Sequence, residues 1–372
     1  MRILIACDSF KDALPASEVC AAIAKGLRKS GQTALHLREM PLSDGGEGVL
    51  EVLRRALSLK SVNLVVSDPL FRPVTASYGI SVDGKTALVE MAEASGLERL
   101  ATGERNPLLT STYGTGELLA DAGARGVRHV LLALGGSATN DAGIGAAAAL
   151  GWRFLNADGE AVSPVGGALQ DIVRIAAPMK LPFEQAEVLC DVTNPLFGSD
   201  GAAFTYGRQK GGTDDSLAKL DQGLRHIAAL VEKQLQRKDL ADVPGAGAAG
   251  GFGFGALAFL DAKLKRGIDT VLDIVGFERA ARAADLVITG EGRLDAQSGE
   301  GKLVQGVCRR AGAVPVVALC GSLAATPEQI KAIGLKAAYS INPVQKSLPE
   351  MLAATAENLE KAAASLLEKF EA

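Results

Sequence analysis

The chain has 372 residues, of which 48% are hydrophobic and 22% charged. This length allows two domains, because single hydrophobic cores rarely grow past about 250–300 residues, and the composition excludes a disordered chain. A net charge of −4 argues against a nucleic-acid or anionic-membrane surface, which needs clustered basic residues, and no apolar run is long enough for a membrane-spanning helix.

Both ends of the chain predict strands that alternate with helices. Short apolar runs predict the strands, and apolar residues at helical spacing predict the helices. The expected strands are residues 2–6, 34–40, 286–289, 314–319 and 337–341, and the expected helices are 15–30, 47–57, 277–284, 302–311, 328–333 and 348–370. The first apolar run is too short for a signal peptide, so we expect a buried first strand and a cytoplasmic protein.

The middle of the chain predicts a different pattern. Residues 62–66, 74–82 and 86–90 alternate as strands, with Asp83-Gly84 as a hairpin turn between the last two. Further strands are expected at 129–134 and 187–190, and helices at 116–124, 143–150, 214–237 and 252–264.

These elements predict an α/β protein of two domains. Two strands from the start and three from the end would form a five-stranded parallel sheet covered by helices. We therefore expect a discontinuous Rossmann-like domain of residues 1–66 plus 268–372, with a second α/β domain of residues 67–267 inserted in the middle of the chain.

Polar, glycine-rich turns follow the predicted strands. Open α/β sheets bind ligands at the carboxyl ends of their parallel strands. The turns are Asp8-Ser9-Phe10-Lys11-Asp12, Asp44-Gly45-Gly46-Glu47-Gly48, Gly135-Gly136-Ser137-Ala138-Thr139-Asn140-Asp141, Asp191-Val192-Thr193-Asn194-Pro195 and Gly290-Glu291-Gly292-Arg293-Leu294-Asp295. Carboxylates gathered there need a cation or facing lysines, and oxygen ligands with few histidines favour Mg²⁺.

Each of these motifs also has a purely structural interpretation. Asp44 with Glu47 three residues later fits a capping box, and Asp141 fits a helix N-cap. Asp191 and Asn194 could form an Asx turn, and Lys11 could be a solvated surface lysine. The sequence leaves these alternatives open.

Familiar nucleotide-binding motifs are absent from the sequence. The glycines at 245, 247 and 250 spell G-x-G-x-x-G, but a charged helix and Pro244 precede them instead of a strand. Residues around Gly301-Lys302 do not complete a P-loop. Phosphoryl transfer here would therefore need an architecture other than the P-loop. A glycine turn at the start of a helix can still bind phosphate through its free backbone N–H groups.

The ordered set of turns resembles type I glycerate kinases. The resemblance also includes Gln209-Lys210-Gly211, Cys190 to Leu196 and the glycine-rich stretch 244–251, and it extends in order from the N-terminus to about Leu319. It implies ATP and Mg²⁺ dependence and a two-domain fold with its active site in the cleft. One departure is Asp12-Ala13-Leu14, where relatives tend to carry smaller residues.

Roles for the candidate residues follow from this resemblance and from the chemistry of phosphoryl transfer, which needs positioning and charge neutralisation. The expected catalytic residues are Lys11, Asp44, Asp191, Glu291 and Asp295, and the expected substrate contacts are Asp8, Ser9, Asn194, Arg293 and Lys302. Nucleotide or phosphate contacts are expected from Gly135, Gly136, Ser137, Thr139, Asn140, Lys210, Gly247 and Gly250, and metal ligation from Asp44, Glu47 and Asp191.

The expected activity is ATP-dependent phosphorylation of D-glycerate, with 2-phosphoglycerate favoured over 3-phosphoglycerate. Two alternatives stay open: a kinase of another small hydroxy acid on the same scaffold, and a hydroxy-acid sensor without catalysis. The expected partners are glycerate and ATP, with no nucleic acid or membrane; the sequence leaves the oligomeric state open, with a homodimer as one possibility.

Overall fold

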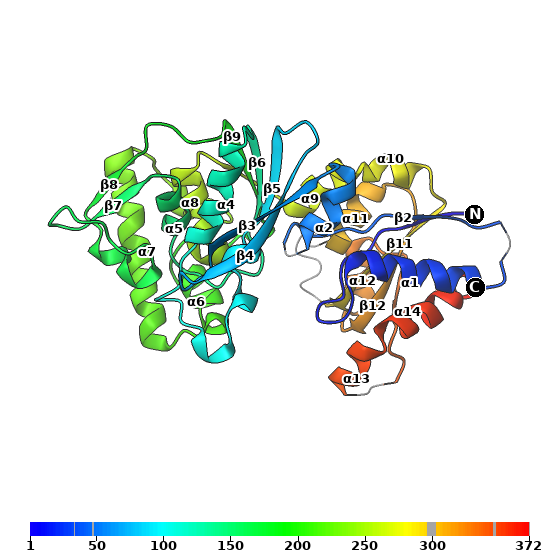
Figure 1. Ribbon diagram of the computed structural model, residues 1–372. Helices are drawn as coiled ribbons and strands as arrows, with labels where there is room; N and C mark the ends of the chain where they lie inside the picture. The colour runs from blue at the N-terminus through cyan, green and yellow to red at the C-terminus, as the bar shows by residue number, and fades with distance from the viewer. Residues whose placement is uncertain (33, 47, 296–302, 345–346, 372) are drawn as a thin grey trace. The chain divides into compact units, whose positions relative to one another are not determined.

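The computed structural model describes residues 1–372 except 33, 47, 296–302, 345, 346 and 372. The chain divides into two compact units (Figure 1). The first unit contains Met1–Asp44, Glu51–Ala56 and Ile268–Ala372, and the second contains Gly45–Leu50 and Leu57–Gly267.

The first unit is built on a five-stranded sheet in the order β13-β12-β11-β1-β2. All four strand pairs are parallel. The strands are β1 (Arg2–Ile5), β2 (His36–Glu39), β11 (Leu286–Leu294), β12 (Val316–Leu323) and β13 (Ala337–Ser340). The predicted sheet of two early and three late strands is therefore confirmed.

Strands β11 and β12 extend further than the sequence suggests. We expected residues 290–295 to form a turn, whereas β11 continues to Leu294 and pairs Glu291 with Cys320 and Arg293 with Ser322 of β12. The glycines permit this extension because the two backbones approach closely: a Cβ on Gly321 would lie 2.5 Å from the carbonyl oxygen of Gly292. The turn prediction for 290–294 is wrong, and these residues form the carboxyl-terminal part of β11.

Helices pack around this sheet. They are α1 (Ala16–Lys29), α2 (Val49–Ala56), α9 (Gly267–Val275), α10 (Phe277–Arg282), α11 (Leu303–Ala311), α12 (Pro327–Ile333), α13 (Leu348–Ala353), α14 (Thr355–Ala364) and α15 (Leu366–Glu371). Helix α14 lies beside α1 (Figure 1), and a Cβ on Gly26 of α1 would lie 2.2 Å from the carbonyl oxygen of Glu360. Glycine at this position therefore lets the two helices pack closely.

The single helix expected at 348–370 is wrong, because the structure divides this segment into α13, α14 and α15. Ala354 and Ser365 adopt ψ angles of 3° and 1°, which interrupt the regular helical hydrogen-bond ladder.

The second unit contains a six-stranded sheet in the order β10-β9-β6-β5-β4-β3. Strands β3, β4 and β5 pair antiparallel, and the β5–β6, β6–β9 and β9–β10 pairs are parallel. The strands are β3 (Lys60–Ser67), β4 (Pro73–Ile80), β5 (Thr86–Glu90), β6 (His129–Ala133), β9 (Gln185–Leu189) and β10 (Lys263–Lys265). Asp83 and Gly84 connect β4 to β5 as predicted, with Gly84 at a φ of 71°. A small hairpin of β7 (Arg153–Leu155) and β8 (Arg174–Ala176) was not predicted.

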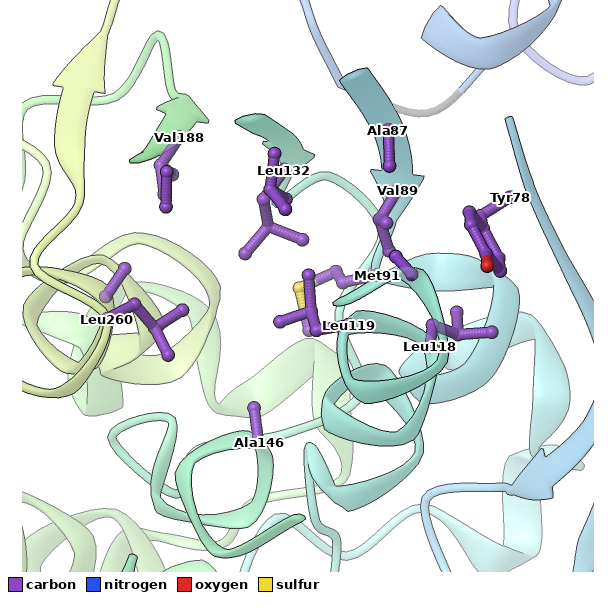
Figure 2. Close-up of a cluster of buried hydrophobic side chains, with 14 of the residues drawn as sticks. Tyr78, Ala87, Val89, Met91, Leu118, Leu119, Leu132, Ala146, Val188 and Leu260 are labelled. Atoms are coloured by element: carbon purple, nitrogen blue, oxygen red, sulfur yellow. The ribbon is translucent and has the colours of Figure 1, made fainter. Parts of the chain in front are cut away.

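The helices of the second unit cover an apolar core. They are α3 (Ala92–Ser95), α4 (Tyr113–Ala124), α5 (Ile144–Ala149), α6 (Ala202–Tyr206), α7 (Asp214–Leu235) and α8 (Ala248–Phe259). Figure 2 shows Leu118 and Leu119 of α4 facing Val89 and Leu132 of the sheet, with Leu260 on the same side. This packing buries one face of the sheet around β5, β6 and β9.

The helix expected at 252–264 ends at Phe259, because Lys263–Lys265 pairs with β9 as β10. The domain boundary at residue 66 stays a prediction. All of β3 pairs with β4, and the second compact unit accordingly includes residues from Leu57 onward. No helix among the described residues is long and apolar enough to span a membrane.

A left-handed turn opens α8. Ala249, Gly250 and Gly251 have φ angles of 52°, 68° and 87°, so three successive residues leave the helical region. A Cβ on Gly250 would lie 2.0 Å from the carbonyl oxygen of Thr139, and the amide of Ala142 donates to the Gly250 carbonyl at 3.1 Å. The turn therefore supports the 135–141 loop through direct backbone contact.

We predict that Gly250→Ala lowers the free energy of unfolding by about 2–5 kcal/mol, because backbone strain and a steric clash act together. Gly84→Ala is the matched control: its φ of 71° is similar, but no atom lies within 4 Å of the added Cβ. The control should lose only about 1–2 kcal/mol. Equal losses in urea denaturation would refute the close contact.

Candidate functional site

Asp8 lies just past the end of β1, beside β11. Its amide donates to the carbonyl of Gly290 at 3.0 Å, which extends the β1–β11 pairing beyond the strand. Its carboxylate accepts the amide of Ser9 at 2.7 Å and the Ser9 hydroxyl at 3.4 Å. The structure thus brings Asp8 and Ser9, both predicted substrate contacts, to the carboxyl edge of the sheet.

Three carboxylates influence one another at this edge. Burial raises the pKa of Asp8 well above its ordinary value, and the negative charges of Asp44 and Glu291 raise it further. The hydrogen bonds from Ser9 oppose this shift only in part. Like charges that share a poorly solvated site favour protonation of one member. A proton, a cation or a hydrogen-bond donor on a ligand would therefore stabilise this group.

Apolar surroundings also raise the pKa of the buried thiols nearby. Burial is the main cause for Cys7 and for Cys320, with added repulsion from acidic neighbours. Protonated, buried thiols are poor nucleophiles. These cysteines therefore behave as small hydrophobic residues, as unpaired cysteine usually does.

The donor chemistry of Asp8, Asp44 and Glu291 suits a hard cation such as Mg²⁺, because all their ligating atoms would be carboxylate oxygens. Among the residues that the structure describes, however, no three His, Cys, Asp or Glu side chains are grouped as metal ligands. The predicted ligand Glu47 lies outside the described residues. The metal assignment of Asp44, Glu47 and Asp191 stays a prediction.

Lys11 occupies a tight turn after β1. Phe10 and Leu14 exchange backbone hydrogen bonds at 2.8 and 2.9 Å, and Asp12 adopts a φ of 61°. The Lys11 side chain is exposed, and its backbone nitrogen would lie 3.6 Å from a Cβ on Gly292 of β11. The turn therefore lies against the segment that carries Glu291.

Arg293 and Asp295 form an ion pair at this end of β11, with 3.1 Å between Nε and the carboxylate. The Arg293 side chain is 69% exposed, so the pair itself adds little to stability. Lys302, the remaining predicted substrate contact on this side of the chain, lies outside the described residues.

In the second unit, the loop of residues 135–141 follows β6. Gly136 adopts a φ of 70°, and its carbonyl accepts the amide of Leu97 at 2.8 Å. Lys210 ends the one-turn helix η4 (Arg208–Lys210) and donates from Nζ to the Ser137 hydroxyl and the Thr139 carbonyl, both at 2.7 Å. This lysine therefore connects η4 to two residues of the loop.

Lys210 is only 2% exposed. Burial lowers the pKa of its ammonium to about 7, and the charge of Asp141 partly offsets this shift. Because two of the three N–H donors of Lys210 already bind the loop, this buried lysine stabilises the conformation of the loop. Its predicted contact with phosphate stays a prediction.

Asp141 serves as a helix cap. Its fully buried carboxylate accepts the amide and hydroxyl of Thr112, each at 2.8 Å, and the amides of Gly143 and Gly145 at 3.1 and 3.3 Å. Burial still raises its pKa despite these hydrogen bonds. The geometry therefore favours the capping interpretation of this residue.

Gly247 and Asn194 meet in a close backbone contact. The Gly247 amide donates to the Asn194 carbonyl at 2.9 Å, and a Cβ on Gly247 would lie 2.2 Å from the Pro195 carbonyl oxygen. The Asn194 side chain donates to the Asp200 carbonyl at 2.8 Å and accepts the Tyr206 hydroxyl at 2.6 Å. The amide nitrogen and oxygen of Asn194 therefore both bind residues of the segment that follows it. The expected contact of Asn194 with substrate stays a prediction.

Asp191 directly follows Cys190 at the end of β9. Burial raises the pKa of the Cys190 thiol to about 11, and the charge of Asp191 adds to the shift. Ala133 at the end of β6 pairs with Leu189 at the end of β9, and the two strands are parallel. Asp191 and the 135–141 loop therefore lie at the same, carboxyl-terminal end of the sheet.

Sequence reasoning missed Arg105. Its backbone carbonyl would lie 2.1 Å from a Cβ on Gly211, which directly follows Lys210, and its Nε is buried. No sequence signal marks it, because Arg105 stands in a short irregular segment without a recognisable motif.

The model of the glycerate kinase family matches residues 3–371 of the chain. A glycerate kinase of Halalkalibacterium halodurans is 45% identical over 98% of this chain and 97% of its own length. A glycerate 2-kinase of Escherichia coli is 41% identical over the same shares. A crystal structure from Salmonella typhimurium LT2, named as a glycerate kinase 2, has a TM-score of 0.85 at 39% identity and covers 100% of this chain and 98% of its own.

We predict that Asp8→Asn stabilises the protein at pH 7.5 by about 0.5–2 kcal/mol, the usual range when a strained functional group is relieved. Because its pKa is raised on folding, Asp8 binds a proton more tightly in the folded protein than in the unfolded chain, so wild-type stability falls as pH rises from the ordinary aspartate pKa toward the raised one.

The gain from Asp8→Asn should therefore shrink as the pH is lowered toward about 4. Asp12→Asn, an exposed neighbour in the next turn, is the control and should change stability by less than about 0.5 kcal/mol at every pH. A destabilised Asp8→Asn variant at pH 7.5 would contradict the assignment of a raised pKa.

Proposed function

From the premise that this chain belongs to the glycerate kinase family, we propose that it transfers the γ-phosphoryl group of ATP to D-glycerate. The observation that carries this proposal is the match of the family over residues 3–371, together with relatives named glycerate kinase that cover nearly all of the chain. The alignments with two of these relatives cover 97% of each relative's own length.

The product of the proposed reaction is 2-phosphoglycerate. The Escherichia coli relative, named glycerate 2-kinase, supports phosphorylation at the 2-hydroxyl. Assembly as a homodimer and a cytoplasmic location stay predictions.

The carboxylates around Asp8 supply the acid–base chemistry in this proposal. A general base works best when its pKa approaches the operating pH, and both burial and neighbouring charge move the pKa of Asp8 in that direction. Asp8 or its neighbour Glu291 would accept the proton of the attacking hydroxyl, and Ser9 would keep the Asp8 carboxylate in place.

Positive charge has to balance the transferring phosphoryl group. The Lys11 ammonium makes no hydrogen bond or ion pair within the part of the chain that the structure describes, and it is exposed beside β11. It can therefore reach a phosphate oxygen as a mobile point charge. Mg²⁺ is the proposed metal, and the assignment of Asp44, Glu47 and Asp191 as its ligands stays a prediction from the sequence; when bound, the ion would supply further positive charge against the phosphate oxygens.

Two alternatives would give different results in one assay. The kinase of another hydroxy acid would release ADP with a different three- or four-carbon substrate, and a sensor would release none. The mutually repelling carboxylates around Asp8 favour an enzyme, because burial and neighbouring charges shift pKa values most often at catalytic sites.

ADP release should be measured over a panel of small hydroxy acids, and phosphorus NMR should identify the product. We expect the highest kcat/KM with D-glycerate and the phosphoryl group on the 2-hydroxyl. A higher kcat/KM with another acid would overturn the substrate, and 3-phosphoglycerate would overturn the position.

We predict that Lys11→Met lowers kcat by roughly 10²–10³, the scale for loss of one preorganised electrostatic contact. The methionine keeps the apolar stem and removes the charge, so the melting temperature without ligand should stay within about 2 °C. Lys331→Met, an exposed lysine on α12, is the control and should leave both quantities unchanged. Near-normal turnover by Lys11→Met would refute the catalytic role.

A further inference from the structure

Several side chains of the second unit bury polar atoms without a hydrogen-bond partner among the described residues. Three of them are Arg105 through Nε, Thr139 through its hydroxyl, and Asn140 through both ends of its amide. His129 Nε2 also lacks a hydrogen bond but lies 3.5 Å from the carboxylate of Glu187. Buried polar groups are rarely left unsatisfied in folded proteins, so this group needs a physical explanation.

The two segments that carry these atoms lie against each other. The Thr110 hydroxyl donates to the Ala138 carbonyl at 3.0 Å. A Cβ on Gly166 would lie 2.5 Å from the Asn140 carbonyl oxygen and 2.7 Å from the Pro107 carbonyl oxygen. The segment that follows Arg105 therefore runs beside residues 138–140.

A second contact fixes the other end of this arrangement. The Arg105 carbonyl lies against Gly211, and the preceding Lys210 donates to the Thr139 carbonyl. Arg105 is thus tied to the same loop through η4, and its side chain is half-buried instead of solvated. Thr139 and Asn140 are fully buried.

Arg105 has an acidic neighbour but does not pair with it. The preceding residue, Glu104, binds Arg72 at 2.6 Å, and Arg72 also binds Asp68 at 2.6 Å. Within the described residues, the Arg105 guanidinium forms no ion pair, although an acid precedes it in the chain. A half-buried arginine without an acidic partner is expensive unless an anion satisfies it.

Most of the unsatisfied atoms are donors: an arginine N–H, two amide N–H groups and a hydroxyl. The arginine guanidinium presents its N–H groups in a planar arrangement that matches two oxygens of a carboxylate or phosphate. The inference rests on the proposed kinase function, whose ligands carry carboxylate and phosphate groups. We infer that Arg105, Thr139 and Asn140 form a subsite for an anionic oxygen group of a substrate, either the carboxylate of the hydroxy acid or a phosphate of the nucleotide.

The test uses the full chain with Arg105→Met, Arg105→Lys and the control Arg174→Met, an exposed arginine on β8. Steady-state kinetics should give KM for glycerate and for ATP, and calorimetric titration should give Kd for glycerate alone and for ADP alone. We expect Arg105→Met to raise the constant of one ligand by about 10- to 100-fold, with the other changed by less than about threefold. Arg105→Lys should recover only part of the loss, because it keeps the charge and loses the planar donor pair.

The ligand that weakens identifies the source of the anion: glycerate for a carboxylate, ADP and ATP for a phosphate. Addition of guanidinium ion to an Arg105→Ala variant should restore part of the affinity, which a purely structural arginine would not allow. If Arg105→Met does not fold, Arg105→Lys carries the same titrations. Unchanged Kd values for both ligands in a folded Arg105 variant would overturn the inference.

A wild-type protein that does not phosphorylate glycerate would refute the proposed function without deciding this question. The ADP titration still measures the contribution of Arg105 in that case, so the two failures can be distinguished.

Discussion

The first unit depends on the pairing of β1 with β11. Ile3, Leu4 and Ile5 pair with Leu286, Val287 and Ile288, which come far later in the sequence. This pairing continues as the hydrogen bond from Asp8 to Gly290 and brings the Asp8 carboxylate under the influence of Glu291. The acidic group thus exists only because two distant strands share one register, and any shift of that register would separate its members.

The second unit fixes its loop in a different way. Residues 135–141 contact a glycine turn through backbone atoms, receive the ammonium of Lys210 and end in the capping carboxylate of Asp141. Each contact uses a buried group, so the loop has few alternative conformations. A loop fixed from several sides can hold ligand groups without reorganising when they bind, which is what electrostatic catalysis requires.

The sequence predicted the parallel sheet of the first unit because its strands are short apolar runs between helical segments, and the Asp83-Gly84 turn because its residue types favour positive φ. It missed the extension of β11, since Gly290-Glu291-Gly292 is typical of a turn unless a neighbouring strand pairs with it. The sequence did suggest that Asp8 and Glu291 lie at one end of the sheet, because each directly follows a predicted strand. Arg105 could not be predicted, because it stands out only through a buried Nε that has no hydrogen-bond partner among the described residues, which the sequence does not reveal.

The division of the first unit between the two ends of the chain has a consequence for protein synthesis. Strands β1 and β2 leave the ribosome early, whereas β11, β12 and β13 are made only after the contiguous stretch Leu57–Gly267. That stretch has its own sheet and cores and can fold as soon as it emerges. The early β1–β2 pair meanwhile carries an open edge at β1, so this segment is exposed to misassociation during translation until Leu286–Leu294 arrives.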